Sequence, residues 1–299
     1  MDPATDLFQK HRSRLYGLAY RMLGTPADAE DVLHDAWLRW HQQDQSALDD
    51  AEAWLVTVTT RLALDRLRRA KTEREHYTGP WLPEPLVAEE EQPELVLERS
   101  ESLSLSFLAL LERLSPEERA SFLLNQVFDY SHAEAAAMLQ ISEDASRQRT
   151  HRARQRLREG RPRFTHAPET QQRLLQKLLE ALHHPDLDNL QALFAEDIVH
   201  DADGGGLVSA TLHPLFGAER IARLYLQIAL HNQQAGAVHR LRWVNGAPAL
   251  LTWVNAELST VLWIETDGER ISAIHALRNP GKLVRLKSVT NGPDDASLS

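Results

Sequence analysis

The sequence predicts a multidomain protein in which two all-α helical domains, the second of them a helix-turn-helix, precede an α+β domain. Apolar residues at helical spacing on both sides of a Pro- and Glu-rich break predict the two helical domains. Strand-like runs separated by Asn-Gly and Asp-Gly turns predict the α+β domain near the C-terminus. The length of 299 residues is enough for two or three domains.

The composition excludes several classes of protein. The chain has no cysteine, which excludes disulfides, thiolate zinc sites, iron–sulfur clusters and cysteine nucleophiles. No segment approaches the roughly 18 apolar residues of a membrane span, and the first residues carry charges instead of an apolar signal core. We therefore expect a cytosolic protein with no membrane contact, no metal and no cofactor.

The net charge of −10 conceals segments of opposite charge. The segment Arg147–Arg163 holds eight arginines and a single acid, Glu159. By contrast, Glu84–Glu101 holds seven glutamates and a single arginine, Arg99. The overall charge argues against a nucleic-acid partner, but the basic segment favours one.

Residues 1–78 form the first predicted helical domain. Gly24-Thr25-Pro26 separates its first two helices, and the polar stretch Gln42–Asp50 separates the second from the third. The apolar residues that share helical faces lie in Phe8–Met22, Val32–Trp40 and Leu55–Leu62.

Residues 79–100 form a predicted extended linker. The run Gly79-Pro80-Trp81-Leu82-Pro83-Glu84-Pro85 cannot continue a helix, and Glu89-Glu90-Glu91 favours solvent.

Residues 101–163 form the predicted helix-turn-helix domain. A helix begins at Pro116 with acidic residues in its first turn. Ser131 and Glu134 form a capping box that opens a short helix, and Ser142 caps a longer helix that runs into the arginines. A short helix, a turn and a longer basic helix are typical of a helix-turn-helix.

Residues 164–287 form the predicted α+β domain, and residues 288–299 a disordered tail. Its helices are expected at Glu169–Leu182, Leu187–Phe194 and Gly217–His231. An antiparallel meander with tight turns at Asn245-Gly246 and Asp267-Gly268 is expected to follow, with strands at Val238–Val244, Ala249–Asn255, Leu258–Thr266 and Ile271–Leu277.

The helix after Ser142 is the first candidate DNA-binding element. Its N-terminal residues Arg147, Gln148 and His151 are placed to reach base edges in a major groove. The following arginines suit phosphate contacts: Arg149, Arg152, Arg154 and Arg156. The alternative is an arginine-rich solvated helix end that the helix dipole favours. The capped helix-turn-helix upstream favours the DNA-binding interpretation.

The third N-terminal helix is the second candidate. Arg61, Asp65 and Arg68 lie at positions i, i+4 and i+7, with Arg69 beside them. This face either holds separated DNA strands or is an ordinary solvated surface. The neighbouring Trp40 and Trp54 fit a core better than a stacking platform.

With these motifs, residues 6–160 resemble a bacterial RNA polymerase sigma factor of the extracytoplasmic-function type. The segment Asp28–Trp40 is similar to the region-two helix that binds the polymerase clamp, and Ala53–Arg69 to the part that opens and reads the minus-ten element. The segment Leu114–Arg154 resembles region four, which reads the minus-thirty-five element. Gln140 departs from a common Gly in the turn, and Arg61 from a common Asn. The resemblance implies polymerase contacts through Asp28, Glu30, Asp31, Asp35 and Leu38.

The remainder resembles a subgroup of these factors with a fused SnoaL-like domain, a cone-shaped α+β fold that regulates the sigma factor in cis. Three motifs carry this resemblance: Trp81-Leu82-Pro83-Glu84-Pro85, Asp203-Gly204-Gly205-Gly206 and Asn279-Pro280-Gly281-Lys282-Leu283, where Gly281 replaces the usual Asp. The resemblance implies regulatory roles for Trp81, Pro83, Asp203, Gly204, Gly205, Asn279, Pro280 and Lys282.

The sequence therefore predicts a monomeric sigma factor that binds core RNA polymerase and promoter DNA and is not an enzyme. One alternative is a helix-turn-helix regulator that responds to a small ligand of its C-terminal domain. Another is a cone-fold enzyme with a DNA-binding appendage, for which the acid/base candidates are His200, Asp201, Asp203, His213 and His275. No nucleophile–base spacing is evident among them, which favours a non-catalytic domain.

Overall fold

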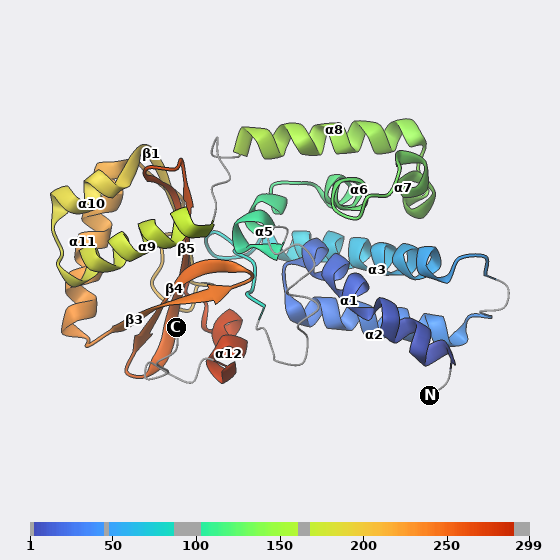
Figure 1. Ribbon diagram of the computed structural model, residues 1–299, viewed down its shortest axis with the longest axis horizontal. Coiled ribbons are helices and arrows are strands. Elements are labelled where there is room, and N and C mark those ends of the chain that lie inside the picture. Colours follow the sequence, from blue (N-terminus) through green and yellow to red (C-terminus); the bar gives the residue numbers. More distant parts are fainter. Residues whose placement is uncertain (1–2, 45–47, 87–102, 161–167, 290–299) are drawn as a thin grey trace. The chain divides into compact units, whose positions relative to one another are not determined.

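The computed structural model describes residues 3–44, 48–86, 103–160 and 168–289 (Figure 1). These residues form two compact units. The first contains the chain up to His76 and residues 107–160, and the second contains the linker from Tyr77 and the chain after residue 167. Among the described helices, none combines the length and apolar character that a membrane span requires.

Three helices form the N-terminal part of the first unit: α1 (Pro3–Leu23), α2 (Pro26–Gln42) and α3 (Ala51–Arg74). Thr25 caps α2 ahead of Pro26, and the Asp50 side chain caps α3 by accepting from the Ala53 amide at 2.9 Å. Trp40 is fully buried, and its indole N–H donates to the Ala4 carbonyl at 2.8 Å. The helices expected here are confirmed, as is a core position for Trp40.

Four further helices follow: α5 (Leu105–Leu111), α6 (Pro116–Gln126), α7 (His132–Leu139) and α8 (Glu143–Gly160). Both α6 and α7 begin with a capping box, formed by Ser115 with Glu118 and by Ser131 with Glu134. Gln140 ends α7 in the left-handed conformation, with φ 56° and ψ 47°. The expected helix-turn-helix is confirmed, and Gln140 adopts the conformation that Gly usually supplies.

The second unit contains α9 (Pro168–His183), α10 (Leu187–Leu193), α11 (Ala218–Gln234) and α12 (Pro280–Val289). Its strands are β1 (Phe194–Asp203), β2 (Leu215–Phe216), β3 (Val238–Val244), β4 (Ala247–Val254), β5 (Glu257–Thr266) and β6 (Ile271–Leu277). They form one sheet in the order β2-β1-β6-β5-β4-β3.

The sheet confirms the expected antiparallel meander, but strand β1 corrects the expectation that the strands begin at Val238. Strands β3 to β6 are antiparallel neighbours as expected, but β1 pairs with β6 in parallel and with β2 in antiparallel orientation. The sequence pattern does not reveal strand β1, because its acidic and histidine side chains hide the apolar alternation. Helix α12 is a second correction, since it places Ser288 and Val289 in a helix instead of a tail. The remaining tail residues and residues 87–102 of the linker and next domain lie outside the described residues.

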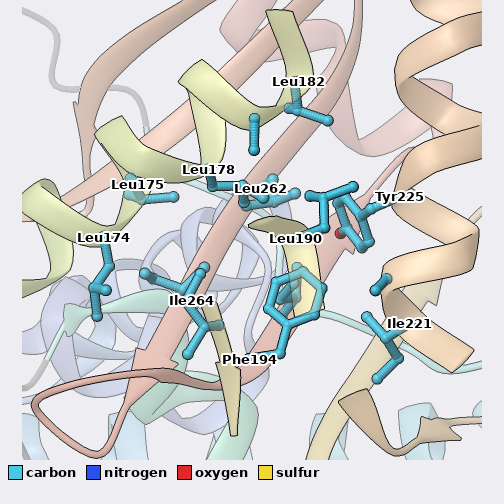
Figure 2. Packing of buried hydrophobic residues seen from close by; sticks show 14 of the residues in the cluster. Leu174, Leu175, Leu178, Leu182, Leu190, Phe194, Ile221, Tyr225, Leu262 and Ile264 are labelled. Atoms are coloured by element: carbon cyan, nitrogen blue, oxygen red, sulfur yellow. The ribbon is translucent and has the colours of Figure 1, made fainter. Parts of the chain in front are cut away.

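One face of the sheet packs against α9 and α11 around an apolar core (Figure 2). Leu178 and Leu182 come from α9, and Tyr225 comes from α11. Leu262 and Ile264 of β5 meet them from the sheet. This face therefore carries an apolar core of the unit, and strand alternation turns the intervening side chains to the opposite face.

The opposite face carries apolar and polar side chains, and α12 packs against β5. On this face the imidazole of His275 lies between two carboxylates, with Nδ1 3.4 Å from Asp201 and Nε2 3.4 Å from Glu265. The indole of Trp263 stacks on the same imidazole at a centroid distance of 5.4 Å. Burial alone would lower the pKa of His275, but the two carboxylates outweigh burial and raise the pKa to about 9.

We expect the stability of the C-terminal domain to depend on the charge of His275. Because the folded pKa lies above the unfolded value of about 6.5, protonation stabilises the fold. The contribution, on the order of 3 kcal/mol, is complete below about pH 6.5 and is lost as pH rises to about 9. The ring signal of His275, assigned by its absence in H275Q, should titrate near pH 9 in NMR spectra, and the thermal midpoint should fall more between pH 6.5 and 9.5 in the wild type than in H275Q. Titration at or below pH 6.5 would contradict this expectation.

Candidate promoter-binding and linker-docking sites

Helix α8 packs on the first unit through one narrow face, and most of its other side chains are exposed. Its buried side chains are Ser146, Thr150, Ala153 and Leu157. Ser142 caps the helix by accepting from the Ala145 amide at 3.1 Å. All six candidate DNA-binding residues therefore project away from the core; Arg149 is half-buried, and the others are exposed: Arg147, Gln148, His151, Arg152 and Arg154.

Several of these arginines have partners within the helix-turn-helix domain. Arg147 pairs with Glu143 one turn earlier. Arg154 donates to the Gln126 side chain at the end of α6, from Nε at 3.0 Å and Nη2 at 2.5 Å. Hydrogen bonds thus orient the guanidinium groups of Arg147 and Arg154. Gln148 lies near the middle of the exposed face of α8, opposite the buried side chains.

Helix α3 carries the second candidate set, and the structure brings part of it onto the helix-turn-helix. Arg61 donates from Nε to the Met138 carbonyl at 2.8 Å, near the C-terminus of α7. Arg68 donates to Glu117 at 2.9 Å and to Asp65 at 3.0 Å. Arg69 is exposed. The minus-ten candidates therefore lie together on one helix, and two of them contact the helix-turn-helix region.

A buried ion-pair network that sequence reasoning missed lies beneath these contacts. Glu112 accepts from Arg119 at 2.7 Å and from Arg74 of α3 at 2.5 Å. Arg119 is 2% exposed and also donates to the Met22 carbonyl at 2.9 Å. Burial favours the protonated form of Glu112, but Arg119 and Arg74 outweigh it and hold its pKa below the usual value. The network ties α1 and α3 to α6 and to the end of α5.

Helix α2 presents most of its expected polymerase-binding residues to solvent. Glu30, Asp31 and Asp35 are exposed, and Leu38 is 45% exposed, which is unusual for a large apolar side chain. Asp28 is more enclosed, because it accepts from Arg66 at 2.7 Å and from the Thr25 hydroxyl at 2.6 Å. Asp28 therefore also has a structural role at the start of α2.

The second unit contains a site where the linker docks on the C-terminal domain. At its centre Asp203 is fully buried. Its carboxylate accepts from the Tyr77 hydroxyl at 2.5 Å, the Leu82 amide at 2.9 Å and the Lys282 ammonium at 2.7 Å. Lys282 also donates to the Leu82 carbonyl at 2.6 Å. The Asp203 carboxylate therefore receives three donors from parts of the chain far apart in sequence.

Aromatic rings of the linker complete the surroundings of Lys282. Its ammonium lies 3.9 Å from the centroid of Trp81 and 5.1 Å from that of Tyr77. Asn279 donates to the Tyr77 hydroxyl at 2.7 Å. A buried ammonium with a carboxylate and two aromatic faces has its charge compensated on several sides.

Backbone requirements explain the other motif residues at this site. Gly205 has φ +62°, and a Cβ there would lie 2.3 Å from the Asn279 side-chain nitrogen. A Cβ on Gly204 would lie 2.5 Å from the Val208 carbonyl. Pro280 is the first residue of α12, and Pro83 is buried. The three sequence motifs thus meet at one site.

The five candidate acid/base residues do not converge on a common site. Asp203 is occupied by the linker, and His275 with Asp201 lies on the same face of the sheet. His200 lies on the opposite face against Tyr225, and His213 is exposed in the β1–β2 loop. Within the described ranges, no group of three or more His, Asp or Glu residues could hold a metal ion.

Comparison with known proteins matches these sites to one family. Residues 7–73 match the family model of Sigma-70 region 2, and residues 104–157 match that of Sigma-70, region 4. The ECF RNA polymerase sigma factor SigJ of Mycobacterium tuberculosis is 32% identical over 292 residues, which cover 92% of this chain and 91% of SigJ. The probable ECF RNA polymerase sigma factor SigI of the same species is 29% identical over 294 residues, covering 97% and 98% of the two chains.

The crystal structure of Mycobacterium tuberculosis SigJ is also similar to this chain. The two align with a TM-score of 0.74 and 31% identity, over 93% of this chain and 98% of SigJ. The α+β unit after residue 167 fits the SnoaL-like domain expected from the sequence. Because both sigma regions occur in order and the similarity to SigJ spans the fused C-terminal domain, the chain belongs to the extracytoplasmic-function (ECF) RNA polymerase sigma factors, which bind core RNA polymerase and promoter DNA to initiate transcription.

Proposed function

We propose that this sigma factor reads the minus-thirty-five element with α8 and the minus-ten element with α3, and that its C-terminal domain regulates it in cis through the docked linker. The docking of residues 77–86 on Asp203 carries the regulatory part of this proposal, because it joins the segment between the two sigma regions to the C-terminal domain. The exposed N-terminal turns of α8, positioned by a capped helix-turn-helix, support the promoter contacts.

The residues take different roles in this proposal. On α8, Arg147, Gln148 and His151 contact base edges, and the later arginines contact phosphates. On α3, the opened minus-ten element is contacted by a set of four residues: Arg61, Asp65, Arg68 and Arg69. The exposed acids and Leu38 of α2 bind the polymerase clamp.

The docked linker gives the C-terminal domain a means of regulation. A linker held at Asp203 has fewer conformations than a free one, so docking limits how far the two sigma regions can separate. A signal that releases the linker shifts the population toward molecules whose regions can spread over polymerase and promoter. In this proposal the factor is monomeric and cytosolic, the C-terminal domain has no catalytic role, and a small ligand of that domain is one form the signal can take.

In vitro transcription tests the central proposal. Full-length protein should co-elute with core polymerase and support run-off transcription from a cognate promoter, and the run-off level should change when residues from Asn279 onward are deleted. Failure of both the full chain and residues 1–160 to co-elute or to direct transcription would contradict it. Tight sequence-specific binding of duplex DNA with no effect of polymerase would favour a conventional helix-turn-helix regulator.

The substitution R147A tests base recognition by α8. Loss of a bidentate base contact should weaken binding of the polymerase–sigma complex to the upstream element by about 1–3 kcal/mol and relax the preference at one base pair. The matched control is R223A, because Arg223 forms the same exposed i, i+4 pair with Glu219, but in the C-terminal domain. Equal weakening of R147A on every upstream sequence would make Arg147 a phosphate contact.

The substitution D203N tests linker docking. The neutral amide that D203N introduces offers no charged acceptor to the Leu82 amide and Lys282, so amide exchange at Leu82 should accelerate by about tenfold or more. Hydrogen-exchange mass spectrometry of the full chain measures this, with D197N on the exposed side of the same strand as the control. Unchanged exchange at Leu82 would contradict a docked linker held by Asp203.

A further inference from the structure

Two neighbouring glutamates in the first turn of α6 lie among the arginines of both predicted promoter-binding helices. Glu117 accepts from Arg68 of α3 at 2.9 Å. Glu118 accepts from Arg156 of α8 at 2.6 Å, and Arg152 lies 3.5 Å from it. The two carboxylates therefore contact guanidinium groups from two separate helices of the same compact unit.

The arginines from α8 lie on one flank of that helix. Arg149, Arg152 and Arg156 are three and four residues apart, so their side chains share a side facing the start of α6. Burial would raise the pKa of Glu117, but a hydrogen bond from its own backbone amide, the hydrogen bond with Arg68 and the charges of Arg68 and Arg149 hold the pKa below the usual value. Glu117 therefore stays ionised beside guanidinium groups from both helices.

Glu118 is fixed more firmly than an ordinary surface acid. Its residue is 4% exposed, although its two arginine partners are about half exposed. The same carboxylate accepts from the Ser115 amide at 3.0 Å as part of the capping box. The position of the negative charge is thus set by the start of α6, while the guanidinium groups that reach it belong to solvent-facing side chains.

We propose that Glu117 and Glu118 act as an internal substitute for DNA phosphates, which holds Arg68, Arg152 and Arg156 in the free protein and competes with promoter DNA for them. This inference rests on the proposed DNA-binding roles of α3 and α8. A carboxylate and a phosphate both offer guanidinium charge-assisted hydrogen bonds of the same kind. DNA therefore binds these arginines only when their existing ion pairs with Glu117 and Glu118 break.

The contact of Arg61 with α7 also competes with binding of DNA to α3. Arg61 donates to the Met138 carbonyl at 2.8 Å, so a second minus-ten candidate is engaged by region four. Binding of DNA along α3 must displace both Arg61 and Arg68 from region four.

The substitution E118Q isolates the charge of this pair, because Gln also forms a capping box. The control is E134Q, which makes the same change at the same position of the α7 capping box, where the described residues give Glu134 no arginine partner. Both variants change the net charge equally. We expect E118Q to bind a labelled promoter duplex about three- to tenfold more tightly than E134Q at low salt, measured by anisotropy with the full chain, and the difference to shrink as salt rises.

Two further measurements keep the inference testable if E118Q perturbs folding. E117Q removes the acidic partner of Arg68, whose side chain is half exposed. This substitution should also tighten DNA binding, by a smaller factor of about two to three. In the R152Q/R156Q background, E118Q should no longer change DNA affinity, because its competing partners are absent. Far-UV circular dichroism and thermal unfolding establish that each variant is folded.

Equal affinities of E118Q and E134Q for the promoter duplex would overturn the inference. Weaker binding by E118Q would also overturn it, and would make Glu118 a positioning residue that DNA binding requires. An effect of E118Q that persists at high salt or in R152Q/R156Q would also overturn it. Absence of promoter binding by every variant at low salt would refute the DNA-binding role of α8 itself. That result, together with a failed run-off assay, distinguishes failure of the proposed function from failure of this inference.

Discussion

The buried carboxylate of Asp203 is the constraint on which the C-terminal unit and its linker depend. A fully buried charge is tolerated only when donors surround it, and here the donors come from Tyr77, Leu82 and Lys282. Removing one partner of such a pair typically costs about 3–5 kcal/mol, because the remaining charge stays buried. The three segments must therefore assemble together, and the linker becomes part of the folded domain instead of a passive connection.

The first unit contains a similar arrangement of charge. There the largely buried carboxylate of Glu112 is compensated by Arg119 and Arg74, which join the end of α5 to α6 and α3. Buried ion pairs add little net stability compared with apolar packing, but they penalise every arrangement in which one partner is missing. In each unit, an enclosed acid and its partners thus favour one arrangement of segments that are distant in sequence.

Local signals in the sequence are sufficient to predict most of the helices and the helix-turn-helix, whereas the three motifs that meet at Asp203 are singled out only by the resemblance to a known family. Capping boxes at Ser115 and Ser131 act within one turn, so their spacing can be read directly from the chain. Strand β1 and its parallel pairing with β6 depend on non-local register, and its polar residues give no alternating pattern. Three ion-pair partners escape prediction for the same reason, because each comes from an element far along the chain: Arg74 for Glu112, Arg156 for Glu118 and Asp201 for His275.

The net charge of −10 therefore does not exclude DNA binding, but it bears on how strongly the chain binds DNA. Several of its arginines already have acidic partners, because the carboxylates of Glu117, Glu118 and Glu143 contact them. Association with DNA becomes an exchange of one set of ion pairs for another, whose net gain is smaller than that of free arginines. We therefore expect a factor with this balance to bind DNA weakly by itself and to gain affinity when polymerase holds both regions against the promoter, because the second contact is then intramolecular.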